Sequence, residues 1–220
     1  MKKVVILNGS PRKNFNTAQA LKEAQRGADS VGAETEYINL VDLNYKGCMS
    51  CFSCKRKGTN LQGLCAWKDE LRPVLEKIIN SDAVIIGSPI YYSYPSGMFR
   101  NLIERMLFAG GTYMIDENGN FMRNLKRNIP VGLIYTMNVQ ENSMSNYNYP
   151  TILGANEFYL KMIYGYCETL NICDTYQFSD YSKYDCNMFD ERHKREIKET
   201  QFPKDLEKAF DLGKRLCLNK

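Results

Sequence analysis

The sequence has 220 residues and a formal net charge of +4, and its hydrophobic and charged shares of 44% and 25% are ordinary for a globular protein. This length suffices for a five-stranded sheet covered on both sides. No apolar run approaches the roughly 20 residues of a membrane-spanning helix, no basic cluster indicates nucleic-acid binding, and no signal peptide is recognisable, so we expect a cytoplasmic protein.

Strand and helix patterns alternate five times along the chain. Short apolar runs predict strands at residues 3–7, 35–40, 83–86, 131–136 and 172–178. Amphipathic stretches predict helices at residues 18–32, 70–81, 96–108, 151–170 and 202–216. This order predicts an α/β fold with a doubly wound, five-stranded parallel sheet and helices on both faces. No linker divides the chain, so we expect a single domain over residues 1–220.

The first predicted strand runs into the loop NGSPRKNFNT at residues 8–17. In a parallel sheet of this type, ligands bind beyond the carboxyl ends of the strands, where the strand order reverses. Ser10 and Thr17 offer hydroxyl groups, Arg12 offers a planar cation, and the next helix begins with unpaired N–H groups. Together these groups suit a phosphate monoester. Neither a dinucleotide fingerprint nor a Walker loop is present, which favours a mononucleotide.

The third predicted strand ends in a second loop of similar character, GSPIYYSYPSG at residues 87–97. Tyr91, Tyr92 and Tyr94 suit the wall of a site for a flat heterocycle, because aromatic faces and backbone amides can serve its face and its polar edge. The alternative is that these tyrosines belong to the core or to an interface.

Taken together, NGSPRKNFNT and GSPIYYSYPSGMFRNLIER resemble the flavodoxin-like NAD(P)H-dependent FMN reductase family, and the likeness in element order extends over the whole chain. The resemblance implies a flavodoxin-like fold and an FMN cofactor. It implies a phosphate site made of Ser10, Arg12, Asn16 and Thr17. It implies an isoalloxazine site made of Pro89, Ile90, Tyr91 and Tyr92, completed by Thr136, Met137 and Asn138. The chain departs from the family at Phe15, where the phosphate loop often has glycine.

NAD(P)H is expected as a transient substrate, because the chain lacks a dinucleotide-binding motif of its own. It should leave before the electron acceptor enters, which predicts ping-pong kinetics. Hydride transfer to a flavin depends on stacking and on exclusion of water more than on an acid or a base, so no catalytic side chain is predicted. The single histidine, His193, falls in the charged stretch DERHKREIKE and is interpreted as a solvated helix residue.

A cysteine-rich segment at residues 45–67 carries Cys48, Cys51 and Cys54 in a C-x-x-C-x-x-C pattern, and Cys65 follows after ten more residues. The first spacings match ferredoxin-type ligands, and the chain also resembles a related iron–sulfur flavoprotein family. In that family the fourth cysteine follows sooner than Cys65 does here. A 4Fe–4S cluster and a four-thiolate zinc site are the two metal-bound alternatives for this segment. We favour a metal-free segment, because buried free cysteine also behaves as a small hydrophobe.

These features predict an FMN-dependent oxidoreductase that passes electrons from NAD(P)H through FMN to a flavin, a quinone or a similar small acceptor. The alternatives are an electron carrier, iron–sulfur or flavodoxin-like, that is reduced by a protein partner, and a module that binds FMN without turnover. An insertion at residues 109–129, with the hairpin signal Asn118-Gly119, and the loop at 138–150 are expected to rim the pocket. We expect them to complete it across a two-fold interface, in a homodimer or a higher homo-oligomer.

Overall fold

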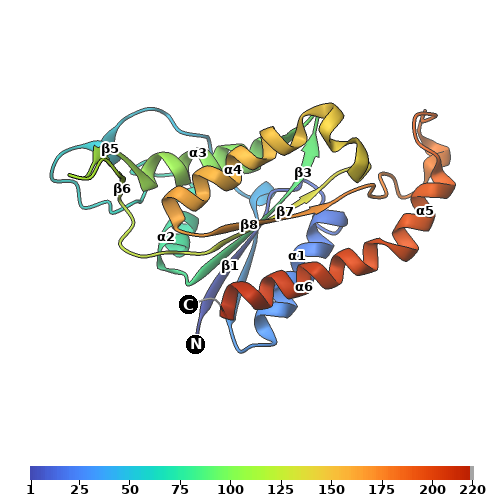
Figure 1. Ribbon diagram of the computed structural model, residues 1–220, viewed down its shortest axis with the longest axis horizontal. Coiled ribbons are helices and arrows are strands. Elements are labelled where there is room, and N and C mark those ends of the chain that lie inside the picture. The colour runs from blue at the N-terminus through green and yellow to red at the C-terminus, as the bar shows by residue number, and fades with distance from the viewer. Residues whose placement is uncertain (219–220) are drawn as a thin grey trace.

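The computed structural model describes residues 1–218. Five parallel strands form the central sheet in the order β2-β1-β3-β7-β8 (Figure 1). The strands are β1 (Lys3–Asn8), β2 (Glu34–Asn39), β3 (Ala83–Tyr91), β7 (Val131–Thr136) and β8 (Cys167–Ile172). The strand order reverses between β1 and β3, as in flavodoxin-like sheets. The predicted five-stranded parallel α/β fold is confirmed.

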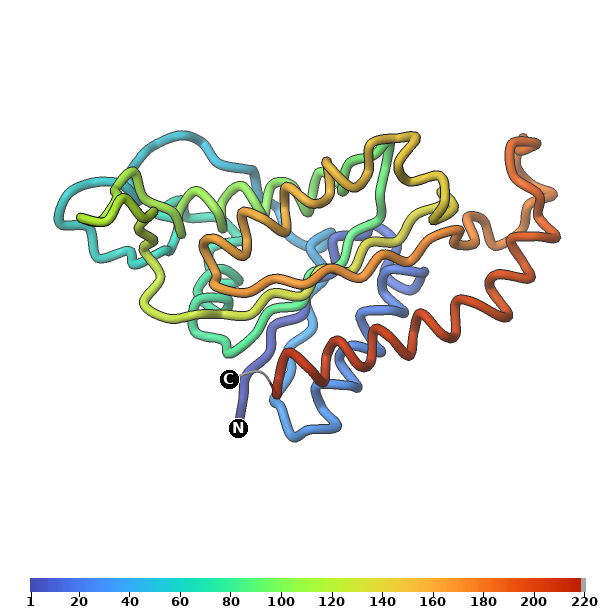
Figure 2. Tube along the Cα trace, in the orientation of Figure 1, coloured from blue at the N-terminus to red at the C-terminus, as the bar shows by residue number. Residues whose placement is uncertain are grey.

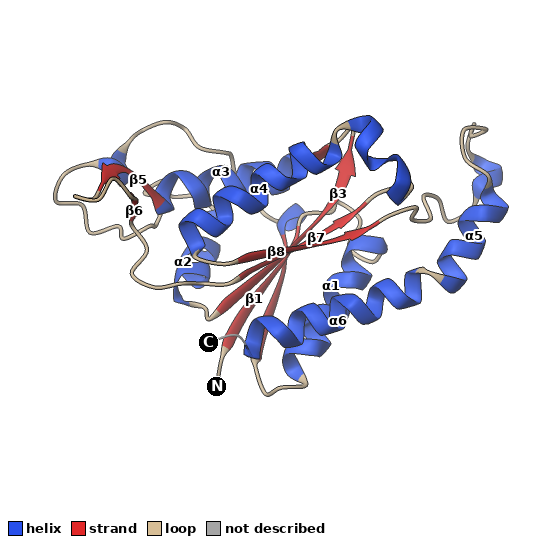
Figure 3. Cartoon of the chain, in the orientation of Figure 1, coloured by secondary structure: helices blue, strands red, loops and turns tan. Residues whose placement is uncertain are grey.

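Helices cover both faces of the sheet (Figure 3). One face carries α1 (Asn16–Asp29) and α6 (Phe202–Leu218), and the other carries α2 (Leu71–Asn80), α3 (Gly97–Gly110) and α4 (Tyr149–Tyr164). Successive side chains of a strand point to opposite faces. Val4 and Ile6 of β1 therefore join the core under α1 and α6, whereas Val5 and Leu7 join the core on the other face. This double burial explains why the strand is apolar throughout.

The predicted boundaries of the fourth helix and of the fifth strand are wrong. Helix α4 ends at Tyr164 rather than at residue 170, and β8 occupies Cys167–Ile172 rather than residues 172–178. Gly165 adopts a φ of 90°, and its N–H donates to the Lys161 carbonyl at 2.9 Å. This left-handed ending stops the helix before the strand begins.

Beyond β8 the chain leaves the sheet and returns along it. Residues 173–190 include the short η4 (Tyr181–Lys183) and lead into α5 (Glu191–Thr200). Figure 2 shows this orange-to-red part extending past the end of the sheet before α6 runs back toward the start of β1. The segment therefore stands beside the loops that follow the strands.

The insertion at residues 109–129 forms the hairpin that its turn signal predicts, with β5 (Gly111–Ile115) paired to β6 (Phe121–Arg123). None of residues 109–129 lines the ligand pocket of this chain, so within one chain the insertion does not rim the pocket as predicted. It packs beside the cysteine-rich segment, where the Phe108 ring lies edge-on to Phe52 and Tyr113, with centroids 5.7 and 6.4 Å away. Helix α3 carries the chain back from the carboxyl end of the sheet, so the hairpin lies at the opposite end (Figure 1).

The remaining elements are short: β4 (Tyr94–Pro95), η1 (Leu40–Asp42), η2 (Ser53–Lys55) and η3 (Glu141–Tyr147). Across residues 1–218, no helix combines the length and the apolar character needed to cross a membrane.

Candidate functional site

A large pocket lies beyond the carboxyl ends of the parallel strands. The loops that follow β1, β3, β7 and β8 all contribute to its lining. Its volume of about 1210 Å³ exceeds the roughly 300–1,000 Å³ that is typical of a site for one small ligand. The pocket therefore has room for a second molecule beside a bound cofactor.

Backbone and hydroxyl hydrogen bonds join the first two loops of this pocket. The Gly9 N–H donates to the Gly87 carbonyl at 2.8 Å, and the Ser96 hydroxyl donates to the Gly9 carbonyl at 2.6 Å. Ser10 closes the first loop, because its Oγ accepts the Arg12 N–H at 3.1 Å. The tips of β1 and β3 are thus held together by the protein itself.

Arg12 and Asn16, two of the four residues predicted to form a phosphate site, line the pocket. The Arg12 Nη1 donates to the Gln177 carbonyl at 2.8 Å, and its guanidinium lies 3.9 Å from the centre of the Phe15 ring. Burial lowers the pKa of Arg12 from its ordinary 12.5, and the nearby Tyr91 opposes this shift. An arginine remains a cation at neutral pH. Phe15, at which the chain departs from the family pattern, therefore makes a cation–π contact with this arginine.

Ser10 and Thr17 are each only 3% exposed and lie outside the pocket lining. The Thr17 hydroxyl is 2.6 Å from that of Thr136, which joins the start of α1 to the end of β7. Their hydroxyls therefore support the loop in this structure, beneath the surface that Arg12 and Asn16 form.

The residues predicted to line a heterocycle site lie together in this pocket. The pocket lining includes Pro89, Ile90, Tyr91, Tyr92, Thr136, Met137 and Asn138. Tyr92 is 98% exposed with a φ of 48°, so its ring stands at the open edge. The Asn138 Oδ1 atom is buried and has no hydrogen-bond partner among the described residues. A buried amide oxygen of this kind is an acceptor available to a ligand N–H group.

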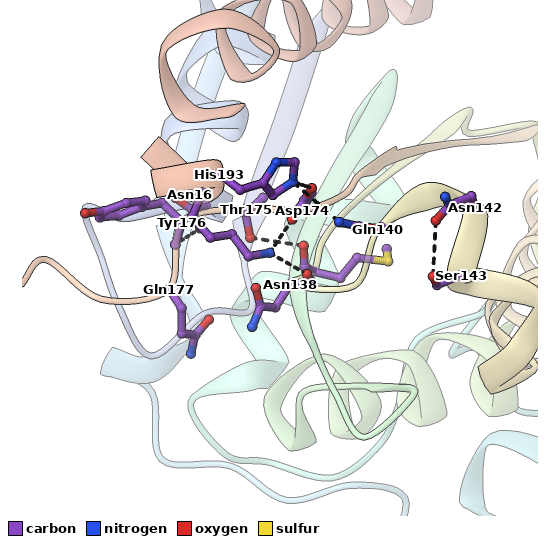
Figure 4. A network of polar contacts seen from close by, with 12 residues as sticks. Asn16, Asn138, Gln140, Asn142, Ser143, Asp174, Thr175, Tyr176, Gln177 and His193 are labelled. Carbon is purple, nitrogen blue, oxygen red and sulfur yellow. Dashed lines mark hydrogen bonds and ion pairs between the residues drawn. The ribbon is translucent and has the colours of Figure 1, made fainter. Parts of the chain in front are cut away.

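Sequence reasoning missed the fourth wall of the pocket, which the chain after β8 provides. The lining here includes Asp174, Thr175, Gln177, Phe178, Cys186, Met188, Phe189, Asp190, His193 and Lys194. Figure 4 shows His193 directed toward Asp174, with Thr175 and Gln140 nearby. The His193 Nε2 lies 2.6 Å from the Asp174 Oδ2, a contact that the interpretation as a solvated helix residue did not include, although the side chain is 38% exposed. Its charged sequence neighbours gave no signal of this contact.

The four cysteines of the cysteine-rich segment line one small cavity, together with Arg105 and Phe108. All four are free thiols, and burial raises the pKa of Cys54. The cavity measures about 10 Å³, which is room for about one water molecule. Among residues 1–218, no three His, Cys, Asp or Glu side chains are arranged as ligands of a metal ion.

The sequence is similar to a known protein family and to several curated proteins. Residues 2–143 match the sequence model of a family described as NADPH-dependent FMN reductase. An iron–sulfur flavoprotein of Archaeoglobus fulgidus is 37% identical over 107 residues, which are 49% of this chain and 50% of that protein. One of Methanocaldococcus jannaschii is 34% identical over 103 residues, 47% of this chain and 51% of that protein. The matching stretch thus spans about half the length of these curated relatives.

Solved structures support the fold. An NAD(P)H:quinone oxidoreductase from Methanothermobacter marburgensis superposes with a TM-score of 0.69 at 14% identity, covering 98% of each chain. An azoreductase from Bacillus anthracis gives a TM-score of 0.62 at 11% identity, covering 98% of this chain and 100% of the other.

Proposed function

Because this chain belongs to the NADPH-dependent FMN reductase family, we propose that it is an FMN-dependent oxidoreductase that passes electrons from NAD(P)H to a flavin, a quinone or a similar small acceptor. The observation that carries the proposal is the union of an arginine-bearing loop and an aromatic wall at the tips of β1 and β3. A phosphate and a planar ring of one molecule can be served by these two loops at once.

The residues of the pocket fit FMN. Arg12 and Asn16 would meet the phosphate, helped by the N-terminus of α1, since that helix begins at Asn16. The orphaned Asn138 Oδ1 would accept an N–H of the ring, and Pro89, Ile90 and Tyr91 would pack against it. Bound FMN supplies a two-electron carrier that takes a hydride from a nicotinamide. The rest of the pocket would hold NAD(P)H and the acceptor in turn.

The test is a two-stage measurement on purified protein. FMN is added to protein freed of flavin, and quenching of its fluorescence reports binding. NADPH or NADH is then mixed anaerobically with the complex, and loss of the flavin absorbance near 450 nm reports reduction. We expect binding, fast reduction and parallel initial-rate lines with a quinone acceptor. Absence of reduction by either nucleotide would refute the oxidoreductase proposal and favour a carrier or a binding module.

The convergence of four cysteines and the likeness to iron–sulfur flavoproteins support a second candidate, an iron–sulfur flavoprotein that exchanges electrons with a protein partner. The cavity between the cysteines, about 10 Å³, would have to widen to hold a cluster. Cys48, Cys51, Cys54 and Cys65 line one cavity, although ten residues separate Cys65 from Cys54 in the sequence. Iron and sulfide analysis after anaerobic purification tests it. Cys54→Ser should abolish bound iron, whereas Cys217→Ala, at a buried position of α6, should not. Iron-free wild-type protein would restore the metal-free interpretation.

We also propose that the chain forms a homodimer or a higher homo-oligomer. The pocket is open at an edge where Tyr91, Tyr92 and Tyr94 are exposed by 44%, 98% and 57%. Exposed aromatic groups of this kind are enriched at protein interfaces. Sedimentation velocity at micromolar concentration tests the proposal, and a fully active monomer that retains FMN would contradict it.

A further inference from the structure

Resting on the proposed function, we propose that His193 is a catalytic residue that donates a proton to a quinone-type acceptor, and that Asp174 holds its ring in position. His193 is the single histidine of the chain and lies outside residues 2–143, which match the family model. The chain after β8 brings it to the pocket (Figure 4). This wall of the site is formed by the C-terminal part of the chain.

Asp174 is held in position by contacts of both its backbone and its carboxylate. Its backbone has a φ of 56°, in the left-handed region, and its N–H donates to the Val139 carbonyl at 2.9 Å. Its Oδ1 accepts a hydrogen bond from Lys194, whose Nζ also donates to the Asn138 carbonyl at 2.7 Å. Lys194 is 2% exposed. Backbone strain retained beside a pocket is typical of functional positions, because the surrounding structure must maintain it.

This arrangement leaves one nitrogen of His193 available. Nε2 is 2.6 Å from the Asp174 Oδ2 and 3.4 Å from the Gln140 Nε2, so this nitrogen is already engaged by the protein. Among the described residues, no hydrogen bond engages Nδ1, and the side chain is 38% exposed on the pocket lining. Asp174 on the packed loop contacts the ring, and Asp190 and Lys194 are the other charged residues that line the pocket at this wall. An imidazole oriented by a carboxylate through one nitrogen is suited to proton transfer at the other.

The chemistry of the surrounding wall favours a neutral planar acceptor. Val139, Met188 and Phe189 line the pocket together with His193. Lys194 is already paired with Asp174, and the other lysine or arginine among the described lining residues, Arg12, belongs to the phosphate loop. An electron acceptor that carries a phosphate would therefore find no unpaired lysine or arginine at this wall. A quinone would find these apolar side chains, and its carbonyl would find His193 as a hydrogen-bond donor.

The proton balance requires such a donor. A quinone that receives a hydride from the reduced flavin becomes a hydroquinone anion, which needs one proton. Imidazolium at His193 supplies it: the Nδ1–H bond breaks, an O–H bond forms on the acceptor, and neutral imidazole remains. The ring recovers a proton from solvent, since it is partly exposed. The two electrons come from the hydride, so His193 changes only its protonation.

The experiment isolates the oxidative half-reaction from the electron source. The holoenzyme is reduced by light, without NADPH, and is mixed with a benzoquinone or with ferricyanide, which accepts electrons without protons. General acid catalysis typically contributes 10²–10⁴-fold. We expect His193→Gln to slow reoxidation by the quinone about 10²-fold and to leave ferricyanide reduction unchanged. Arg192→Gln, an exposed residue of the same helix outside the pocket lining, is the matched control and should change neither rate.

Unchanged quinone reduction in His193→Gln would overturn the proposal, and so would an equal loss with both acceptors, which would locate the effect in the flavin or the fold. A second readout uses the oxidised holoenzyme without an affinity tag, in which His193 gives a single imidazole signal by NMR. Addition of the quinone should shift that signal, and an unmoved signal at saturation would refute the contact. Failure of NADPH to reduce the flavin would instead refute the proposed function and leave both measurements interpretable.

Discussion

We expect Gly27→Ala to destabilise the protein, because α1 and α6 cross there with their backbones in contact. A Cβ atom at Gly27 would lie 1.9 Å from the Phe210 carbonyl oxygen of α6. The contact is reciprocal, since a Cβ at Gly213 would lie 1.9 Å from the Ala24 carbonyl oxygen of α1. The clashing atoms belong to the backbone, so no side-chain rotation can relieve the contact. The two helices must separate by roughly 1.5 Å to restore an ordinary distance.

The size of the effect follows from two opposing contributions. Overpacking in a well-packed interior costs about 1–3 kcal/mol, and a clash with rigid backbone belongs at about 3 kcal/mol. Alanine gains about 1 kcal/mol over glycine in a helix interior. The free energy of unfolding should therefore fall by about 2 kcal/mol. Since α1 begins at Asn16, beside the predicted phosphate loop, the displacement should also weaken FMN binding.

Gly154→Ala in α4 is the matched control, because a Cβ there would meet no atom within 4 Å. The same substitution should stabilise the protein at this exposed helical position by about 0.5–1 kcal/mol. Urea unfolding at equal FMN concentration measures both variants, and an unchanged m-value shows that only stability has changed. If Gly27→Ala proved as stable as Gly154→Ala, the inferred close contact between α1 and α6 would be wrong.

Three further predictions address the cofactor, the buried charge and the alkaline pH range. Arg12→Gln should weaken FMN binding about 10–100-fold in a fluorescence titration, because a charged hydrogen bond contributes about 1.5–3 kcal/mol. Riboflavin lacks the phosphate and should bind equally well to the wild type and to the variant. Arg105→Ala should lower the free energy of unfolding by about 3–5 kcal/mol, because Asp69 would lose its fully buried partner at 2.5 Å. Arg127→Ala breaks an exposed pair with Asp82 and should cost about 1 kcal/mol or less in the same denaturation assay. Burial raises the pKa of Tyr37 to about 12, so its contribution to stability is present below the unfolded pKa of about 10 and is lost as pH rises toward 12. The stability of Tyr37→Phe should decline less than that of wild type over this interval, and parallel decline of the two proteins would contradict the assignment.

Local pattern was sufficient for most of the fold. The apolar runs at β1, β3 and β7 and the amphipathic helices between them place the strands in a parallel sheet, since both faces must be covered. The same pattern brought Arg12 and Tyr91 to one pocket, because carboxyl ends of parallel strands meet at one edge. The position of the fifth strand, β8, was mispredicted because Gly165 ends the preceding helix and the apolar pattern does not mark this ending.

The contacts that required tertiary structure join residues whose neighbours in sequence give no hint of them. Whether the chain after β8 turns back over the pocket depends on how α6 packs against α1, and this packing brings His193 to Asp174. The direction of α3 carries the hairpin to the cysteine-rich segment and away from the pocket. Sequence alone determined the elements and the first two loops, because hydrophobic periodicity and loop chemistry act over a few residues. The structure alone decided the fourth wall and the cysteine cavity, because both depend on which surfaces bury one another.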